Sequence, residues 1–116
     1  PHKSGKRFGI GCQRETHTRW QLVANDGTGT PSLTNMGASF STAAGGVLTL
    51  FIAPANGGSV WAWVVDEVSD AIFEQESTAD LPAATQFLSP RLYLNTGATA
   101  AAVAYDCAGV YLETNC

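Results

Sequence analysis

Charged side chains are scarce in this sequence. Asp, Glu, Lys and Arg make up 14% of the 116 residues, against about 25% in an ordinary soluble domain, whereas hydrophobic residues reach 45%. A surface with so few charges loses little hydration when another subunit docks, so the composition favours a component of an assembly. The length fits one domain with its own hydrophobic core. Because the first residue is Pro1 and not Met, we expect a processed or excised piece.

Long apolar runs and the common catalytic motifs are also missing. No apolar stretch approaches the ~18 residues of a membrane-spanning helix, so we expect no membrane insertion. The three cysteines, Cys12, Cys107 and Cys116, show no metal-ligand spacing, and their odd number excludes a complete set of internal disulfides. His17 has no nucleophile nearby, and neither a Gly-x-Ser-x-Gly elbow nor a P-loop is present. We therefore expect no enzymatic activity and no cofactor.

The few charges are unevenly distributed along the chain. Residues 1–19 carry five Lys and Arg against Glu15, a net charge of +4, whereas the remainder carries Arg91 against nine carboxylates, a net charge of -8. Residues 1–17 show little periodicity, so we expect a flexible basic N-terminal arm there and a single domain over residues 18–116. Five separated cations without interleaved aromatic side chains fall short of a nucleic-acid stripe. Solvent or an acidic neighbour is therefore the expected contact of this arm.

Short β-like segments recur along the domain between turns rich in Gly, Pro and Asn. No segment shows a sustained 3.6-residue apolar period, which argues against helices. The expected strands are 18–24, 47–53, 59–66, 71–76, 87–95, 100–107 and 110–114. This spacing predicts an all-β fold, a jelly-roll-like β-sandwich of about seven or eight strands. Pro90 places its strand at a sheet edge or a bulge.

The segment 59–66 is apolar on both faces. Trp61, Trp63 and Val65 point to one side of the strand, and apolar residues alternate with them on the other. A two-sheet sandwich buries only one face of each strand, so loops or another subunit must cover the second. Trp61 and Trp63 also have the spacing of a sugar-stacking platform, although cores and interfaces use such pairs more often. The residues expected on a ligand-binding or subunit-contact surface are Trp20, Trp61, Trp63 and Tyr93.

One dense acidic patch consists of Asp66, Glu67, Asp70 and Glu74. A glycosidase pair requires two carboxylates facing each other across a cleft, and a calcium loop requires several oxygens from one loop. No Asp-x-Asp-x-Asp-Gly loop is present, and Asp70 fits a turn. Asp66, Glu67 and Asp70 come nearest to a metal site, but we interpret the patch as solvated strand ends and expect no metal.

The carboxy-terminal half has the texture of a known group of proteins. The segments concerned are 79–82 (ADLP), 87–92 (FLSPRL), 95–97 (NTG) and 100–114 (AAAVAYDCAGVYLET), together with Arg19–Trp20 and the later 37–40 (GASF). Over residues 18–115 the sequence resembles C-terminal domains of tailed-bacteriophage virion structural proteins, of the tail-fibre, spike and decoration types. The resemblance implies a β-sandwich, homo-oligomers that are often trimers, and a place on the exterior of the virion. It implies no catalytic residues, and the basic arm lies outside it.

Three functional hypotheses follow from these patterns. The first is a bacteriophage virion protein that assembles through strand faces buried between copies, with itself, other virion proteins and a host-surface glycan as partners. The second is a carbohydrate-binding module that uses exposed tryptophans. The third is a small-virus coat protein whose basic arm contacts the genome, although nucleic acid is not the expected partner.

Overall fold

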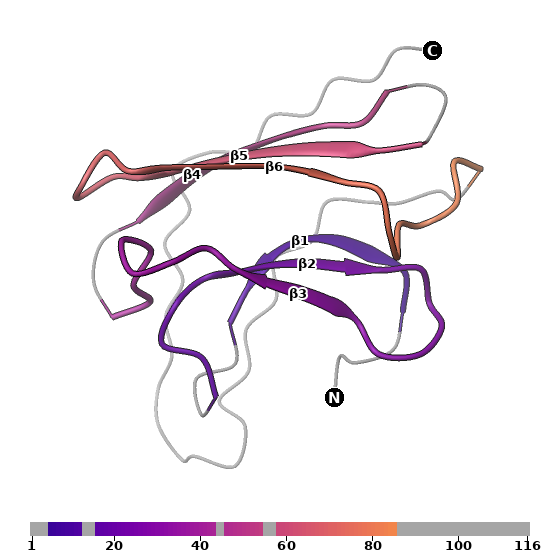
Figure 1. Cartoon of the computed structure of the whole chain (residues 1–116), viewed down its shortest axis with the longest axis horizontal. Coiled ribbons are helices and arrows are strands. Elements are labelled where there is room, and N and C mark those ends of the chain that lie inside the picture. Colours follow the sequence, from indigo (N-terminus) through magenta and orange to yellow (C-terminus); the bar gives the residue numbers. More distant parts are fainter. Residues whose placement is uncertain (1–4, 13–15, 44–45, 55–57, 86–116) are drawn as a thin grey trace.

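The chain folds into two antiparallel sheets that lie face to face, as the computed structural model shows for residues 5–12, 16–43, 46–54 and 58–85. The strands are β1 (Arg7–Gly11), β2 (Gln21–Asn25), β3 (Ser32–Asn35), β4 (Val47–Ile52), β5 (Val60–Asp66) and β6 (Ile72–Ser77). One sheet has the order β1-β2-β3 and the other β4-β5-β6 (Figure 1). The all-β prediction is confirmed. Over these four ranges we find no helix with the length and apolarity to cross a membrane.

Three of the expected strands match β4, β5 and β6 to within one residue at each end. β2 begins at Gln21 instead of Thr18, because the backbone of Trp20 pairs with a loop. Trp20 N donates to Phe40 O at 2.9 Å, and Trp20 O accepts from Met36 N at 3.1 Å. The sequence pattern did not predict β3, which is short and polar. The strands expected at 87–95, 100–107 and 110–114 lie outside the described residues.

The prediction of a flexible arm over residues 1–17 is wrong for β1. Phe8 and Ile10 point inward and pack against the core, opposite Ala24 and Leu22 of β2. Phe8 also meets Phe51 of β4 edge-on, with ring centroids 5.2 Å apart and planes at 84°. Two apolar residues among Lys, Arg and Gly are too short a pattern to predict a strand. Their burial against the second sheet supplies the stabilisation that the local sequence lacks.

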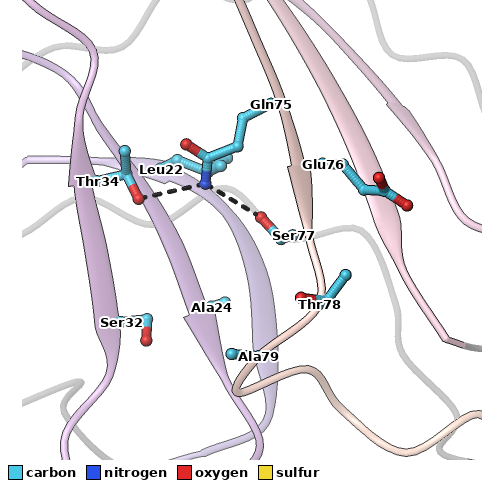
Figure 2. A pocket seen from close by; sticks show the side chains of 9 residues that line it. All are labelled: Leu22, Ala24, Ser32, Thr34, Gln75, Glu76, Ser77, Thr78 and Ala79. Carbon is cyan, nitrogen blue, oxygen red and sulfur yellow. Dashed lines mark hydrogen bonds between the residues drawn. The ribbon is translucent and has the colours of Figure 1, made fainter.

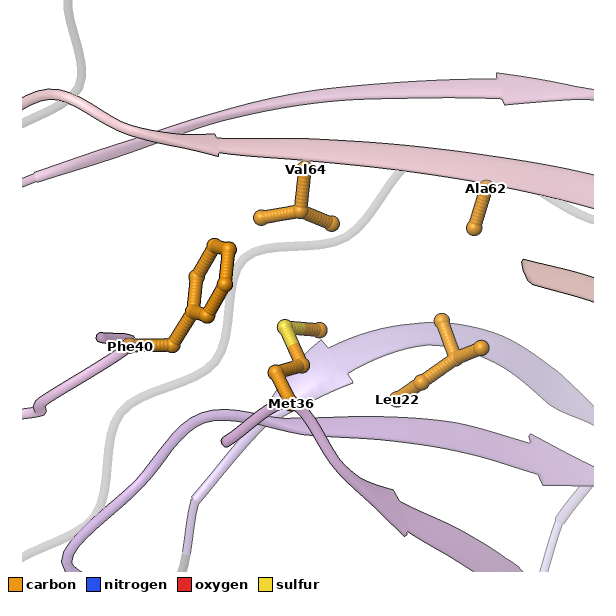
Figure 3. Close-up of a cluster of buried hydrophobic side chains, with 5 residues drawn as sticks. All are labelled: Leu22, Met36, Phe40, Ala62 and Val64. Carbon is orange, nitrogen blue, oxygen red and sulfur yellow. The ribbon is translucent and has the colours of Figure 1, made fainter. Parts of the chain in front are cut away.

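The hydrophobic core lies between the two sheets (Figure 3). Leu22, Met36 and Phe40 approach from the β1-β2-β3 side, and Ala62 and Val64 approach from β5. Both β5 residues are fully buried at 0% exposure. Full burial of an aliphatic side chain of valine size stabilises a fold by about 1.5–3 kcal/mol. This inner face of β5 therefore joins the two sheets.

The β2–β3 hairpin closes through the turn that the Asn, Asp and Gly residues predicted. Asn25 Oδ1 accepts a hydrogen bond from Gly27 N at 2.9 Å, and Gly27 adopts a φ of 94°. Asp26 Oδ1 accepts from Thr28 N at 2.8 Å and from Thr28 Oγ1 at 2.7 Å. These hydrogen bonds lower the pKa of Asp26. Such side-chain acceptors satisfy the turn backbone that no strand can pair.

Candidate functional site

The outward-facing side of the β4-β5-β6 sheet is the most unusual surface of the described chain. Strand register arranges its side chains in three cross-strand rows, which are Leu48–Val65–Ile72, Leu50–Trp63–Glu74 and Ile52–Trp61–Glu76. Seven of these nine residues are apolar. The two exceptions both lie on β6. We call this set of nine residues the tryptophan face.

Much of the tryptophan face is open to water. Leu48, Leu50, Ile52 and Ile72 are 64, 55, 49 and 68% exposed, respectively. Single exposed aliphatic residues are common on protein surfaces, but a contiguous group across three strands marks an interaction site. The sequence predicted that loops or another subunit must cover the second apolar face of 59–66. The same requirement therefore applies to the outer faces of the neighbouring strands β4 and β6.

Trp61 and Trp63 form a stacked pair at the centre of this face. Their ring centroids are 5.6 Å apart and their planes differ by 17°. At that separation two nearly parallel indoles direct their faces largely toward each other. A platform for sugar rings needs both aromatic faces turned to the ligand, so this arrangement suits a packed contact better than a flat platform.

The structure separates the other predicted contact residues from this pair. Trp20 packs against the inter-sheet core, beside Phe40 and Met36. Trp61 and Trp63 lie on the opposite side of the β4-β5-β6 sheet. Tyr93 lies outside the described residues. Trp61 and Trp63 are thus side by side, as their i, i+2 spacing on one strand predicted, whereas Trp20 lies apart from them.

Three residues of the acidic patch, Asp66, Glu67 and Asp70, belong to the end of β5 and the turn after it, whereas Glu74 lies on β6. Asp66 is 4% exposed, and its Oδ2 accepts from Ser69 N at 2.9 Å and from Ser69 Oγ at 2.8 Å. These hydrogen bonds lower the pKa of Asp66. Asp70, with a φ of 59°, closes the turn by donating its N–H to Asp66 O at 2.9 Å. Asp66 is therefore a buried turn acceptor and not the solvated strand end that we expected, whereas Glu67, Asp70 and Glu74 are exposed.

No three His, Cys, Asp or Glu side chains in the described ranges come together in a way that would hold a metal ion. Within the turn, Glu67 lies over Gly46, where a Cβ placed on the glycine would stand 2.9 Å from Glu67 Oε2. Gly46 thus leaves room for this carboxylate to fold back over the β4 end. The turn has a structural role in joining β5 to β6.

A cleft of about 240 Å³ opens between the two sheets and is lined by residues of β2, β3 and β6 and by the two residues after β6 (Figure 2). Its lining residues are Leu22, Ala24, Ser32, Thr34, Gln75, Glu76, Ser77, Thr78 and Ala79. Gln75 Nε2 spans the gap and donates to Thr34 Oγ1 and Ser77 Oγ, each at 3.4 Å. Glu76 is the one titratable residue among the nine, and its carboxylate turns away from Gln75 (Figure 2). Among these nine described residues the cleft offers hydrogen-bonding groups but no nucleophile paired with a base.

The contribution of β4 and Ile72 to the tryptophan face was not predicted from the sequence. The signal was present, because 47–52 (VLTLFI) alternates Leu48, Leu50 and Ile52 with residues of the inner face. A strand that is apolar on both sides predicts that both faces of its sheet are covered by other parts of the protein or by a partner. Only the register shows that these leucines lie beside the tryptophans.

Comparison with protein-family models, with curated proteins and with solved structures finds no match to this chain.

Proposed function

We propose that this protein is a structural subunit of a larger assembly, and that the tryptophan face is the surface through which it docks. The observation that carries the proposal is the contiguous apolar surface of seven residues on the outer side of the β4-β5-β6 sheet. The resemblance of residues 18–115 to virion structural proteins of tailed bacteriophages supplies the setting. In that setting the chain is a tail-fibre, spike or decoration component on the exterior of the particle, built into a jelly-roll-like sandwich.

The energetics of the exposed residues favour docking. Complete burial of a Leu or Ile side chain contributes about 1.5–3 kcal/mol. The four exposed apolar members of the face retain about half or more of that potential, since 49–68% of each is still in water. Covering them therefore stabilises a complex by roughly 3–8 kcal/mol before the cost of association is subtracted.

Low charge density supports the same conclusion. The face carries two carboxylates, Glu74 and Glu76, and both lie on β6 at its margin. A partner can thus cover Leu48, Leu50 and the tryptophans without burying a charge. Buried unpaired charges are the main obstacle to docking, and the core of this face avoids them.

Replacing Trp63 by Ala tests the proposal. The full-length protein should form oligomers as its concentration rises, and Trp63→Ala should abolish them while far-UV circular dichroism stays β-rich. Val68→Ala is the matched control, because Val68 is 71% exposed on the β5–β6 turn and lies off the face. Light scattering or sedimentation velocity measures the mass. A protein that stays monomeric up to roughly 1 mM, where even weak contacts are populated, would contradict the proposal.

A further inference from the structure

The inner side of β6 changes from apolar to polar along the strand. Phe73 packs against the hydrophobic core, and Gln75 and Ser77 follow on the same side of the strand. Their register partners on β5 are Ala62 and Val60, so both polar side chains point into the space between the sheets (Figure 2). Polar groups lose free energy in such a place unless hydrogen bonds replace their hydration.

The strand β3 presents polar side chains to the same space. Thr34 and Ser32 are the register partners of Leu22 and Ala24, which are buried at 2 and 4% exposure. Because register partners share one face of a sheet, Thr34 and Ser32 lie on its inner side. Both line the 240 Å³ cleft, together with the two polar residues of β6. The cleft is therefore the polar part of the space between the sheets.

The hydrogen bonds that cross this cleft are long. Gln75 Nε2 donates to Thr34 Oγ1 and Ser77 Oγ at 3.4 Å in both cases, against about 2.7–3.2 Å for a well-formed N–H···O bond. The amide oxygen of Gln75 lies on the side away from both bonds (Figure 2), and within the described ranges no group donates to it. A carboxamide offers two donor hydrogens and two acceptor lone pairs. Gln75 thus retains hydrogen-bonding capacity for a ligand.

Two further hydroxyl groups extend the polar lining. Ser32 Oγ donates to the Asp80 carboxylate. A hydroxyl oxygen that gives its proton to a neighbour keeps its lone pairs, so Ser32 presents an acceptor to the cleft. Thr78 is exposed and adds another hydroxyl, which both donates and accepts.

The chemistry of the lining fits a small neutral ligand with several hydroxyl groups. Four hydroxyls and one carboxamide supply polar contacts, and Leu22, Ala24 and Ala79 supply apolar ones. None of the nine lining residues is a Lys or Arg, and the Glu76 carboxylate turns away, so an anion finds no counter-charge there. The volume lies below the ~300–1,000 Å³ of pockets for drug-sized ligands, which leaves room for about one sugar ring.

We propose that this cleft binds a neutral monosaccharide unit, free or at the end of a glycan chain. Gln75 and Thr34 are its main hydrogen-bonding partners, and Leu22 and Ala24 pack against its C–H groups. The tryptophan face lies on the opposite side of the β4-β5-β6 sheet, so docking through that face does not involve the cleft. The site adds a second function to docking and does not depend on it.

A sugar titration of the full-length protein, followed by NMR, tests the site. Glucose, galactose, mannose or N-acetylglucosamine should shift the side-chain amide signals of Gln75, with a dissociation constant of about 1–10 mM. Thr34→Val removes Oγ1 at almost constant shape and should raise that constant about 3–10-fold. Thr49→Val is the matched control, because Thr49 lies on the inner side of β4 and not in the lining. Disaccharides identify the source, since tighter binding indicates a chain end and equal binding a free sugar, and either result supports the site.

Two results would overturn the inference. The first is the absence of any shift at Gln75 with every sugar up to roughly 100 mM, which would mean that the cleft holds only solvent. The second is a set of shifts confined to the indoles of Trp61 and Trp63, or an affinity that Trp63→Ala abolishes and Thr34→Val leaves unchanged. The docking proposal would stand in both cases. If Thr34→Val does not fold, Ser32→Ala takes its place, since Ser32 is exposed.

Discussion

The double substitution Leu48→Thr with Leu50→Thr separates the docking role of the tryptophan face from the stability of the fold. Both side chains lie on the outside of β4 and are 64 and 55% exposed, so the isolated fold obtains less than half of their burial energy. Threonine retains a high β-propensity, which preserves the strand. We expect the free energy of unfolding of the monomer to change by less than about 1 kcal/mol.

The dissociation constant of the assembly should change more strongly in this double variant than the free energy of unfolding does. The exposed share of the two leucines is worth about 2–3.5 kcal/mol on full burial, and the threonine methyl groups retain a part of this. A loss of about 1–3 kcal/mol corresponds to a dissociation constant raised roughly 5–150-fold. Sedimentation equilibrium measures this constant, and urea denaturation measures the stability in parallel.

Two control variants complete that experiment. Val68→Thr changes an exposed residue away from the face and should alter neither quantity. Val64→Ala removes buried methyl groups from the core and should lower the free energy of unfolding by about 2–3 kcal/mol, with no direct effect on the docking surface. An unchanged dissociation constant in the double variant would refute the role of the tryptophan face, and a collapse of monomer stability would refute the claim that β4 is open on this side.

Two further predictions concern the fold. Phe8→Ser should lower the free energy of unfolding by about 1–3 kcal/mol in urea denaturation, because Phe8 contacts the core and Phe51, whereas a residue of a flexible arm would change nothing. Asp66 has a lowered pKa because Ser69 donates two hydrogen bonds to its carboxylate, so its contribution to stability is present above its ordinary value of 3.8 and is lost as the pH falls through and below that value. Asp66→Asn should therefore reduce the difference between urea midpoints at pH 7 and pH 3, and a wild-type difference in the variant would contradict the assignment.

Local pattern predicted the two strands that are strongly apolar and the one that follows them across a clear turn. β4 and β5 were recognisable as runs rich in β-branched and aromatic residues, and β6 was recognisable because it alternates along its length directly after the turn at Ser69 and Asp70. β1 and β3 were missed because each has only one or two apolar residues that a partner sheet must complete. The same limit affected the acidic patch, where Asp66 looked solvated but is enclosed by its own turn.

The sequence by itself determined the all-β class, the alternation of β5 and the shortage of charge, since these depend on the period and type of neighbouring residues. Only the tertiary structure decided that Leu48, Leu50 and Ile52 lie beside Trp61 and Trp63, and that Gln75 meets Thr34 across the cleft. Strand register and the pairing of two sheets depend on contacts between residues far apart in the chain. A one-dimensional pattern cannot specify those contacts, because a shift of one residue moves every side chain to the opposite face.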